Sequence, residues 1–377
     1  MTVLFLIALA ILVQAYLGYP LSLMMLRTLL GDRSRHARGD DLPAVSLVIS
    51  AYNEELVIRR KIENSRALDY PEERLEIIVV SDGSTDRTEA IVRDFESRNV
   101  GLRAFKGRQG KVACLNRVIP DLRSDLVVMS DANSMYEPGS LRQLVSHFVD
   151  PRIGCVCGRL RYVNPQDLAS GRGELIYWAY EGLIKRLESS LGSLLGANGA
   201  IYAFRRTLFR PVDPLMFCDD VIPGRIALEG YLTIYDPRAR CEEVTAAEKV
   251  ERHRRARHAS FGLRSMLHLA AEALRSRRFL LAYQCISHRI LRWAGGLSLG
   301  VLLVSSVFLP DPWRAAALAG QGVFYGAAGL GFLASRLGAR ASTLYLPYYF
   351  LVINLAGLAG LRAFLLRADS PFWEPRQ

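Results

Sequence analysis

Hydrophobic runs that end abruptly in acidic or polar residues recur along the first two thirds of the chain. They lie at Val45–Glu55, Glu76–Asp86, Leu126–Asn133 and Met216–Val221. The first three have the pattern of buried parallel strands that deliver polar residues at their C-terminal ends, where open α/β sheets bind ligands. A carboxylate-rich sheet edge suits a divalent cation and a phosphate-bearing ligand, because hard cations prefer oxygen ligands.

Strand-like and helix-like segments alternate through the middle of the chain. Strands are expected at Ala44–Ser50, Leu75–Val80, Gly101–Phe105, Leu126–Met129, Ile153–Arg161, Gly196–Phe204 and Tyr231–Asp236. Helices are expected at Glu54–Ala67, Arg87–Arg98, Val112–Ile119, Glu137–Val149, Leu168–Leu195 and Asp219–Gly230. This alternation with short connections predicts an α/β fold with a mostly parallel sheet covered by helices.

Both ends of the chain are apolar. Met1–Leu26 contains no charged side chain and is long enough to cross a bilayer. A cleaved signal peptide fits less well, because a basic n-region and a small-residue cleavage pattern are missing. The sequence predicts an N-terminal transmembrane helix at 1–30, a soluble domain at 40–250, basic amphipathic interfacial helices at 251–290, and about three transmembrane helices at 291–366.

The formal net charge of +11 is concentrated beside these apolar ends. Arg27–Arg38 contributes +3, and Lys249–Arg278 contributes +7. By the positive-inside rule both flanks belong on the cytoplasmic side, near anionic membrane lipid. We therefore expect a multi-pass inner-membrane protein with a cytoplasmic soluble domain. Nucleic acid is not an expected partner, since no binding motif accompanies the charge. Three C-terminal helices would place Arg362 and Arg367 outside, so a re-entrant or interfacial last segment stays open.

Five short motifs follow one another in the soluble domain. They are Ala51-Tyr52-Asn53-Glu54-Glu55, Ser81-Asp82-Gly83-Ser84-Thr85-Asp86, Gly110-Lys111, Asp131-Ala132-Asn133 and Asp219-Asp220. In this order they resemble the motifs of membrane-bound family 2 glycosyltransferases, the group that contains cellulose, chitin and hyaluronan synthases. The resemblance covers about residues 44–262 together with the flanking membrane segments. It implies a GT-A nucleotide-sugar-binding domain, inversion at the anomeric carbon, and Mg²⁺ or Mn²⁺ as cofactor.

The resemblance assigns the first three motifs to the nucleotide-sugar donor. Tyr52 and Glu54 match the first donor-binding loop, where a ring can lie against the base and a carboxylate can accept hydrogen bonds. Asp82 matches the residue that holds uridine, although an Asp-Gly-Ser run also favours a turn by itself. Lys111 would meet the donor phosphates as a compact positive charge; the alternative is a surface lysine in a flexible loop.

The last two motifs are assigned to the metal and to catalysis. Asp131 and Asn133 resemble a DxD motif, with two oxygen ligands for a metal that also binds the diphosphate. Here Asn133 replaces the second acid, and a local Asn turn is its alternative. Asp219 and Asp220 resemble the family's acidic pair, in which the second acid, Asp220, is the general base that deprotonates the acceptor hydroxyl. A helix N-cap role can coexist with this one.

Two further segments resemble family features less closely. Arg257 falls where the synthases carry a QxxRW motif and could bind pyrophosphate, with Arg254 in place of Gln and His258 in place of Trp. Membrane-surface charge explains Arg257 equally well. Asn198 and Gly199 could line the acceptor side, or form a turn.

The resemblance therefore implies an inverting transferase that moves a sugar from a nucleotide sugar to a growing polysaccharide or lipid-linked glycan, and a UDP-sugar is the expected donor. Polysaccharide-export proteins are possible partners. The alternative is a transferase that adds one sugar to a polyprenyl-phosphate carrier. A non-catalytic membrane scaffold is disfavoured by the presence of Asp82, Asp131 and Asp220.

Overall fold

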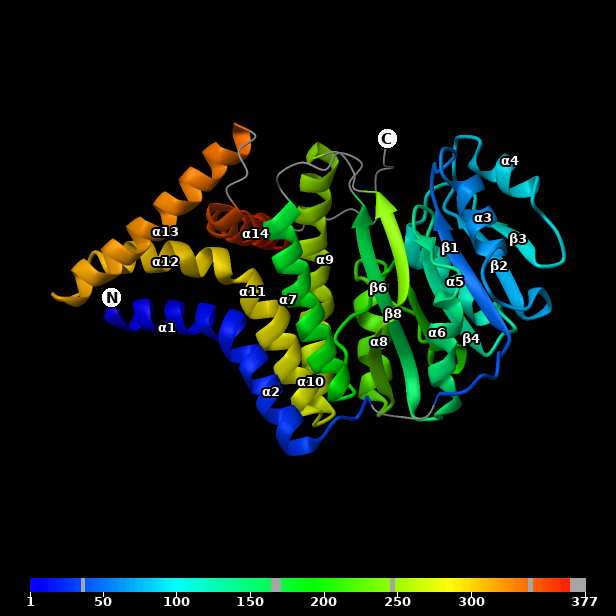
Figure 1. Ribbon diagram of the computed structural model, residues 1–377, viewed down its shortest axis with the longest axis horizontal. Coiled ribbons are helices and arrows are strands. Elements are labelled where there is room, and N and C mark those ends of the chain that lie inside the picture. The colour runs from blue at the N-terminus through cyan, green and yellow to red at the C-terminus, as the bar shows by residue number, and fades with distance from the viewer. Residues whose placement is uncertain (35–37, 164–170, 245–247, 338–341, 367–377) are drawn as a thin grey trace.

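The computed structural model describes residues 1–34, 38–163, 171–244, 248–337 and 342–366. Figure 1 shows an α/β domain on one side and a group of long helices on the other. The domain is built on an eight-stranded sheet of order β3-β2-β1-β4-β7-β6-β8-β5. Its strands are β1 (Val45–Ala51), β2 (Leu75–Ser81), β3 (Val100–Ala104), β4 (Leu126–Asp131), β5 (Met135–Tyr136), β6 (Ile153–Val163), β7 (Tyr202–Arg205) and β8 (Leu232–Val244).

All strands except β5 and β7 run in the same direction, so the sheet is mostly parallel, as predicted. Alternate side chains of β1 enter two different cores: Leu47 and Ile49 lie in one buried cluster and Val48 lies in the other. A parallel sheet covered on both faces requires such apolar runs. In the register, Ser50 pairs with Asp131 and Ala51 pairs with Ser81. The polar residues that follow β1, β2 and β4 therefore emerge at one edge.

Helices cover both faces of this sheet. They are α3 (Ile58–Arg66), α4 (Thr88–Arg93), α5 (Lys111–Val118), α6 (Ser140–Val145), α7 (Gly171–Ser190) and α8 (Cys218–Leu228), and α9 (Glu248–Arg275) packs against α8. Most lie within or close to the predicted segments, but one helix and one strand begin clearly later than expected. The expected helix from Glu54 begins only at Ile58, because the preceding loop, with Asn53 at φ 52°, is tied to the turn after β2. The expected strand from Gly196 is ordered as β7 only from Tyr202.

The remaining helices form the other part of the molecule. They are α1 (Thr2–Val13), the π-helical turn η1 (Gln14–Gly18), α2 (Tyr19–Leu30), α10 (Phe279–Gln284), the π-helical turn η6 (Cys285–Ile290), α11 (Leu291–Trp293), α12 (Gly295–Ser306), α13 (Trp313–Arg336) and α14 (Ser342–Leu365). In Figure 1, α1 and α12 lie side by side, and α13 follows above them. Helix α14 packs against α9 and α13.

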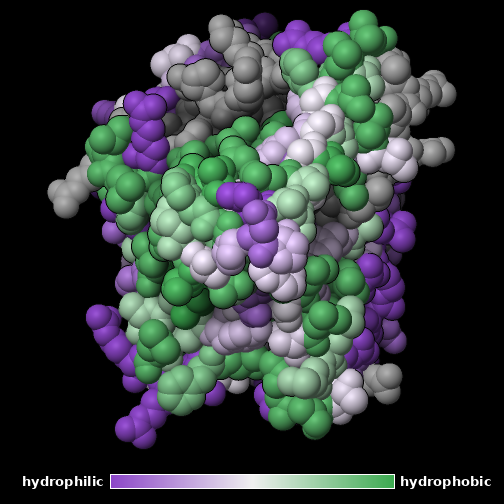
Figure 2. All heavy atoms as spheres, turned by 90° about the vertical axis from the view of Figure 1, so that its left-hand side faces the viewer, coloured by the Kyte–Doolittle hydropathy of each residue, from purple (hydrophilic) through white to green (hydrophobic). Residues whose placement is uncertain are grey.

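Three helices of the described chain are long and apolar enough to cross a membrane: Thr2–Leu30, Trp313–Arg336 and Thr343–Leu365. Large hydrophobic side chains such as Leu6 and Val323 are exposed on them. Figure 2 shows that the end of the molecule carrying these helices is largely hydrophobic. The first of the three predicted C-terminal spans is only the twelve-residue α12, shorter than the ~20 residues a transmembrane helix needs.

Candidate active site

The donor-binding predictions meet at the ends of β1 and β2. Asp82 is buried, and its Oδ1 accepts hydrogen bonds from the backbone N–H groups of Gln109 (2.6 Å) and Gly110 (3.0 Å). This carboxylate therefore fixes the glycine-flanked loop in front of α5. Gly83, at φ 69°, lies so close to the backbone of Gly107 that a Cβ would collide with it. The loop and the turn after β2 form one unit.

Tyr52 and Glu54 lie on the loop that follows β1. The Tyr52 ring is partly exposed, and the Arg108 guanidinium lies 3.8 Å from the ring centroid. Glu54 is buried, and its backbone N–H donates to Thr88 Oγ1 at 2.8 Å. The contact with Thr88 thus anchors the loop to the start of α4, while Tyr52 and Arg108 form a half-buried aromatic–cation pair.

A small hollow lies between these loops and the start of α5. It is lined by Ser50, Ala51, Val80, Asp82, Lys111 and Cys114. Ser50 Oγ is buried there without a hydrogen-bond partner within the described chain. A larger hollow between α2 and α7, lined by Met24, Arg27, Thr28, Asp32 and Leu187, contains none of the predicted site residues. We therefore take the smaller hollow as the donor side of the site.

Lys111 connects the donor side to the acid pair. Its Nζ donates to Asp131 Oδ1 at 2.7 Å, and Asp219 also acts on the same ammonium group. Burial lowers the pKa of Lys111, but the two carboxylates outweigh this effect and raise it above the usual value. Lys111 is therefore a permanent cation at the centre of the site.

Asp131 and Asn133 form a DxN motif, Asp131-Ala132-Asn133, and their side chains suit a hard divalent cation. Asp131 ends β4 with its side chain about one-third exposed (33%), and Asn133 follows in a turn. Within the described chain there is no group of three His, Cys, Asp or Glu residues that could hold a metal by itself. One carboxylate and one amide oxygen fit Mg²⁺ or Mn²⁺ when donor phosphates and water supply the other ligands.

The acid pair opens α8, and two glycines make room for it. A Cβ on Gly199 would lie 2.3 Å from Asp219 Oδ2, and a Cβ on Gly196 would lie 2.4 Å from Asp220 Oδ1. Gly196 has φ +95°, a conformation that favours glycine. The segment expected as a strand from Gly196 is therefore a loop that accommodates both carboxylates.

Asn198 lies between these glycines. Its Oδ1 accepts a hydrogen bond from Lys185 Nζ at 2.5 Å, and its Nδ2 donates to the Gly158 carbonyl at 2.7 Å. Its amide thus holds the loop against α7 and β6. The acceptor role predicted for Asn198 and Gly199 stays a prediction, and the structure adds that both residues shape the surroundings of the acid pair.

A basic side chain from η6 faces Asp220. The Cβ position at Gly196 is 3.4 Å from Arg289 Nη2 as well as close to Asp220, so the two side chains converge there. The run Arg289-Ile-Leu-Arg292-Trp293 has the QxxRW spacing with Arg in place of Gln. This spacing is the sequence signal that points to Arg289. The side chain of Arg257 lies outside the part of the chain that the structure describes, so its predicted role stays untested.

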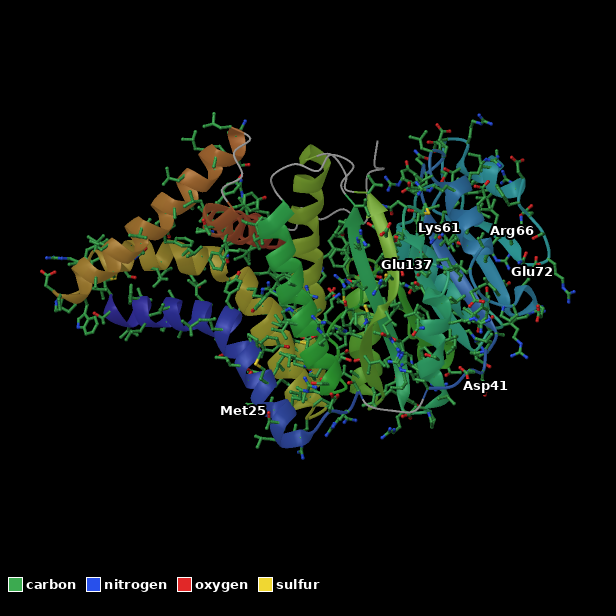
Figure 3. The ribbon with its side chains drawn as sticks, in the orientation of Figure 1. Met25, Asp41, Lys61, Arg66, Glu72 and Glu137 are labelled. Atoms are coloured by element: carbon green, nitrogen blue, oxygen red, sulfur yellow. The ribbon has the colours of Figure 1, made fainter. Side chains whose placement is uncertain are left out.

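Two residues of α3 that sequence reasoning missed hold the loop after Asn133. Lys61 has no solvent exposure; its Nζ donates to the Ser134 carbonyl and lies 4.3 Å from the Tyr136 ring centroid. Asn64 donates to the Tyr136 carbonyl at 2.9 Å and accepts from its N–H at 2.8 Å. Figure 3 shows Lys61 in the same part of the domain as Glu137, which follows β5. These contacts fix the path of the loop that follows the Asp131-Ala132-Asn133 motif.

Activity is expected to rise with pH through about 6. Burial raises the pKa of Asp220 to about 6; the positive charge of Arg289 opposes this effect, and the negative charge of Asp219 adds to it. If Asp220 is the general base, it cannot accept a proton below this pH, because it is already protonated. The acid limb of log kcat/KM against pH should therefore have its midpoint near 6. A flat profile between pH 5 and 7.5 would contradict the assignment.

Comparisons with known sequences identify the domain. Residues 46–212 match the family described as Glycosyl transferase family 2. The chain is 27% identical over 208 residues to poly-beta-1,6-N-acetyl-D-glucosamine synthase of Staphylococcus aureus (strain COL), covering 54% of this chain and 50% of that protein. The synthase of the same name from Staphylococcus epidermidis (strain ATCC 35984) is 27% identical over 203 residues, covering 52% and 49%. The chain thus spans about half the length of the curated relatives it matches.

The fold is also that of a solved structure. A mannosyltransferase from Pyrobaculum calidifontis, in complex with GDP-Man and Mn²⁺, matches with a TM-score of 0.72 and 24% identity, covering 97% of this chain and 100% of that chain. The predicted GT-A fold is confirmed, and residues 46–212 of the chain match the glycosyltransferase family 2 domain. The three long apolar helices of the described chain indicate a membrane protein.

Proposed function

We propose that this family 2 glycosyltransferase moves a sugar, with inversion, from a UDP-sugar to a hydroxyl group of a growing polysaccharide or lipid-linked glycan at the membrane. One observation carries the proposal: Lys111 faces Asp131 on the donor side and Asp219 of the acid pair. The predicted diphosphate site and the predicted base thus share one centre. The similarity to poly-beta-1,6-N-acetyl-D-glucosamine synthases supports an N-acetylhexosamine donor and a glycan acceptor.

Each side chain has a defined task in this reaction. Tyr52 lies against the nucleobase, and the Asp82 carboxylate holds the loop that lines the nucleoside. Lys111 balances charge on the diphosphate, as the compact cation of a phosphate site does. Asp220 takes the proton from the acceptor hydroxyl as its oxygen attacks the anomeric carbon. Inversion in one displacement requires no protein nucleophile.

Asp131 and Asn133 would hold Mg²⁺ or Mn²⁺, which offsets the charge that develops on the departing nucleoside diphosphate. The Mn²⁺ in the complex of the mannosyltransferase supports a divalent ion here. We further propose that the domain is cytoplasmic in a multi-pass inner-membrane protein, because the basic segments flank the apolar helices. Export proteins would then receive the product on the other side.

A donor panel tests the proposal. Detergent-purified protein is incubated with UDP-N-acetylglucosamine, UDP-glucose, UDP-galactose or GDP-mannose, with Mn²⁺, Mg²⁺ or EDTA, and nucleoside diphosphate release is measured. We expect metal-dependent release from one UDP-sugar. GDP-mannose is included because the structural relative binds it; release from GDP-mannose alone would overturn the UDP assignment. No nucleotide binding at all would overturn the enzymatic function.

Product length separates the two acceptor classes. A glycan-extending enzyme gives a ladder of products from a radiolabelled donor, whereas transfer to a polyprenyl-phosphate carrier gives one lipid-soluble product. We expect the ladder, since the similarity is to a polysaccharide synthase. A single organic-soluble product would favour the carrier-lipid alternative.

A further inference from the structure

Glu188 is a carboxylate with no solvent exposure, near the end of α7. Its Oε1 accepts a hydrogen bond from the Tyr19 hydroxyl at 2.6 Å and lies 2.7 Å from His288 Nδ1. Its Oε2 accepts from the Leu195 backbone N–H at 3.1 Å. Burying a carboxylate is costly unless it is paired and hydrogen-bonded. Here the partners come from three separate elements, so the cost is offset by contacts that fix these elements together.

Two of the three partners lead directly to the general base. Leu195 precedes Gly196, the residue at which Asp220 Oδ1 and Arg289 Nη2 converge. His288 precedes Arg289 in the π-helical turn η6. Glu188 therefore holds Leu195 and His288 in place. Each of these residues directly precedes one of the two residues, Gly196 and Arg289, that lie against Asp220.

The third partner belongs to the N-terminal apolar helix. Tyr19 lies within the candidate membrane span Thr2–Leu30 and directly follows the π-helical turn η1. Its ring stacks on that of His288, with a centroid distance of 5.3 Å. Gln14 of η1 donates to Tyr283 Oη at 2.9 Å and to Ser287 Oγ at 3.2 Å. The two π-helical turns thus pack together, and such turns are frequent at functional sites.

We propose that Glu188 is a positioning residue that joins the N-terminal membrane helix to the active site, by holding Leu195–Gly196 and His288–Arg289 around Asp220. This inference rests on the proposed role of Asp220 as general base. It adds a role to the membrane helix, which then orients the groups around the base besides anchoring the protein. Burying a charge in this way fixes one arrangement of elements, since any other arrangement leaves the carboxylate unpaired.

The test uses three single variants in full-length detergent-purified protein. Glu188→Gln should lower kcat by about 10- to 100-fold, and Tyr19→Phe by about five- to tenfold, because each loses hydrogen bonds to a buried charge. UDP affinity and donor KM should stay unchanged, since the donor side lies at the ends of β1 and β2. Tyr180→Phe is the matched control: its hydroxyl also ties α7 to the N-terminal helix, through the Tyr16 carbonyl at 2.8 Å, without reaching Glu188.

Equal losses in Tyr19→Phe and Tyr180→Phe would overturn the proposal, because helix docking alone would then explain them. Wild-type kcat in Glu188→Gln would overturn it as well. If Glu188→Gln fails to fold, the comparison of kcat between Tyr19→Phe and Tyr180→Phe still tests the proposal. The double variant Glu188→Gln/Tyr19→Phe should be no slower than Glu188→Gln, as expected for one shared network. Wild-type turnover in Asp220→Asn, measured in parallel, would refute the base instead.

Discussion

Asp220→Asn is expected to lower kcat for sugar transfer by about 10²- to 10⁴-fold, the usual contribution of a positioned general base. The change keeps the size of the side chain beside Gly196 and removes both its ability to accept a proton and the negative charge that faces Arg289. Asp220 lies in the first turn of α8 and does not line the hollow at the ends of β1 and β2. UDP affinity should therefore be unchanged. The measurement is nucleoside diphosphate release, with UDP binding followed by calorimetry.

The control for this variant is Glu229→Gln, which removes a carboxylate just after the C-terminal end of the same helix. Glu229 pairs with Arg210 at 3.5 Å, and both side chains are at least one-third exposed. Removing this ion pair should change stability and turnover little, because exposed ion pairs contribute only about 0–1 kcal/mol. Turnover of Asp220→Asn within about threefold of the unmodified protein would mean that another group takes the proton. Loss of UDP binding would instead mean that Asp220 shapes the donor side.

Local sequence signals were enough to predict where the proposed donor and metal residues lie. A hydrophobic run that ends in a polar residue places that residue at the end of a strand, and parallel strands bring these ends to one edge. Ser50 opposite Asp131 and Ala51 opposite Ser81 show that the edge forms as expected. The contact between Lys111 and Asp131 at this edge was not predicted; the sequence indicated only a lysine near the donor phosphates.

Buried charged side chains that bind partners on distant elements could not be recognised from local sequence patterns. Glu188 meets partners from residues 19, 195 and 288, and Lys61 meets the carbonyl of Ser134. In the sequence, Glu188 and Lys61 resemble ordinary charged residues on helices, because periodicity records which face is apolar and not which charges pair across elements. The loop that begins at Gly196 was predicted as a strand for a related reason. Its apolar composition suits a strand, but the space needed by the two carboxylates decides its path.

Asp131→Asn is expected to lower kcat by at least about 100-fold. Its carboxylate is the charged member of the DxN motif, and Lewis-acid stabilisation of a leaving diphosphate is worth several kcal/mol, with 1.4 kcal/mol for each tenfold change in rate. The variant also removes the charge that pairs with Lys111 at 2.7 Å. The Lys111 ammonium would then face one carboxylate, Asp219, instead of two. Both effects slow the same step, the departure of the nucleoside diphosphate.

Metal affinity separates this role from a purely structural one. Mn²⁺ binding in the presence of UDP, followed by electron paramagnetic resonance, should weaken in Asp131→Asn, whereas UDP binding in EDTA should not. Asp125→Asn is the matched control, because Asp125 lies exposed just before the other end of β4 and should behave like the unmodified protein. Unchanged Mn²⁺ affinity with reduced turnover would show that Asp131 acts through Lys111 alone, and the DxN motif would then lose its metal assignment.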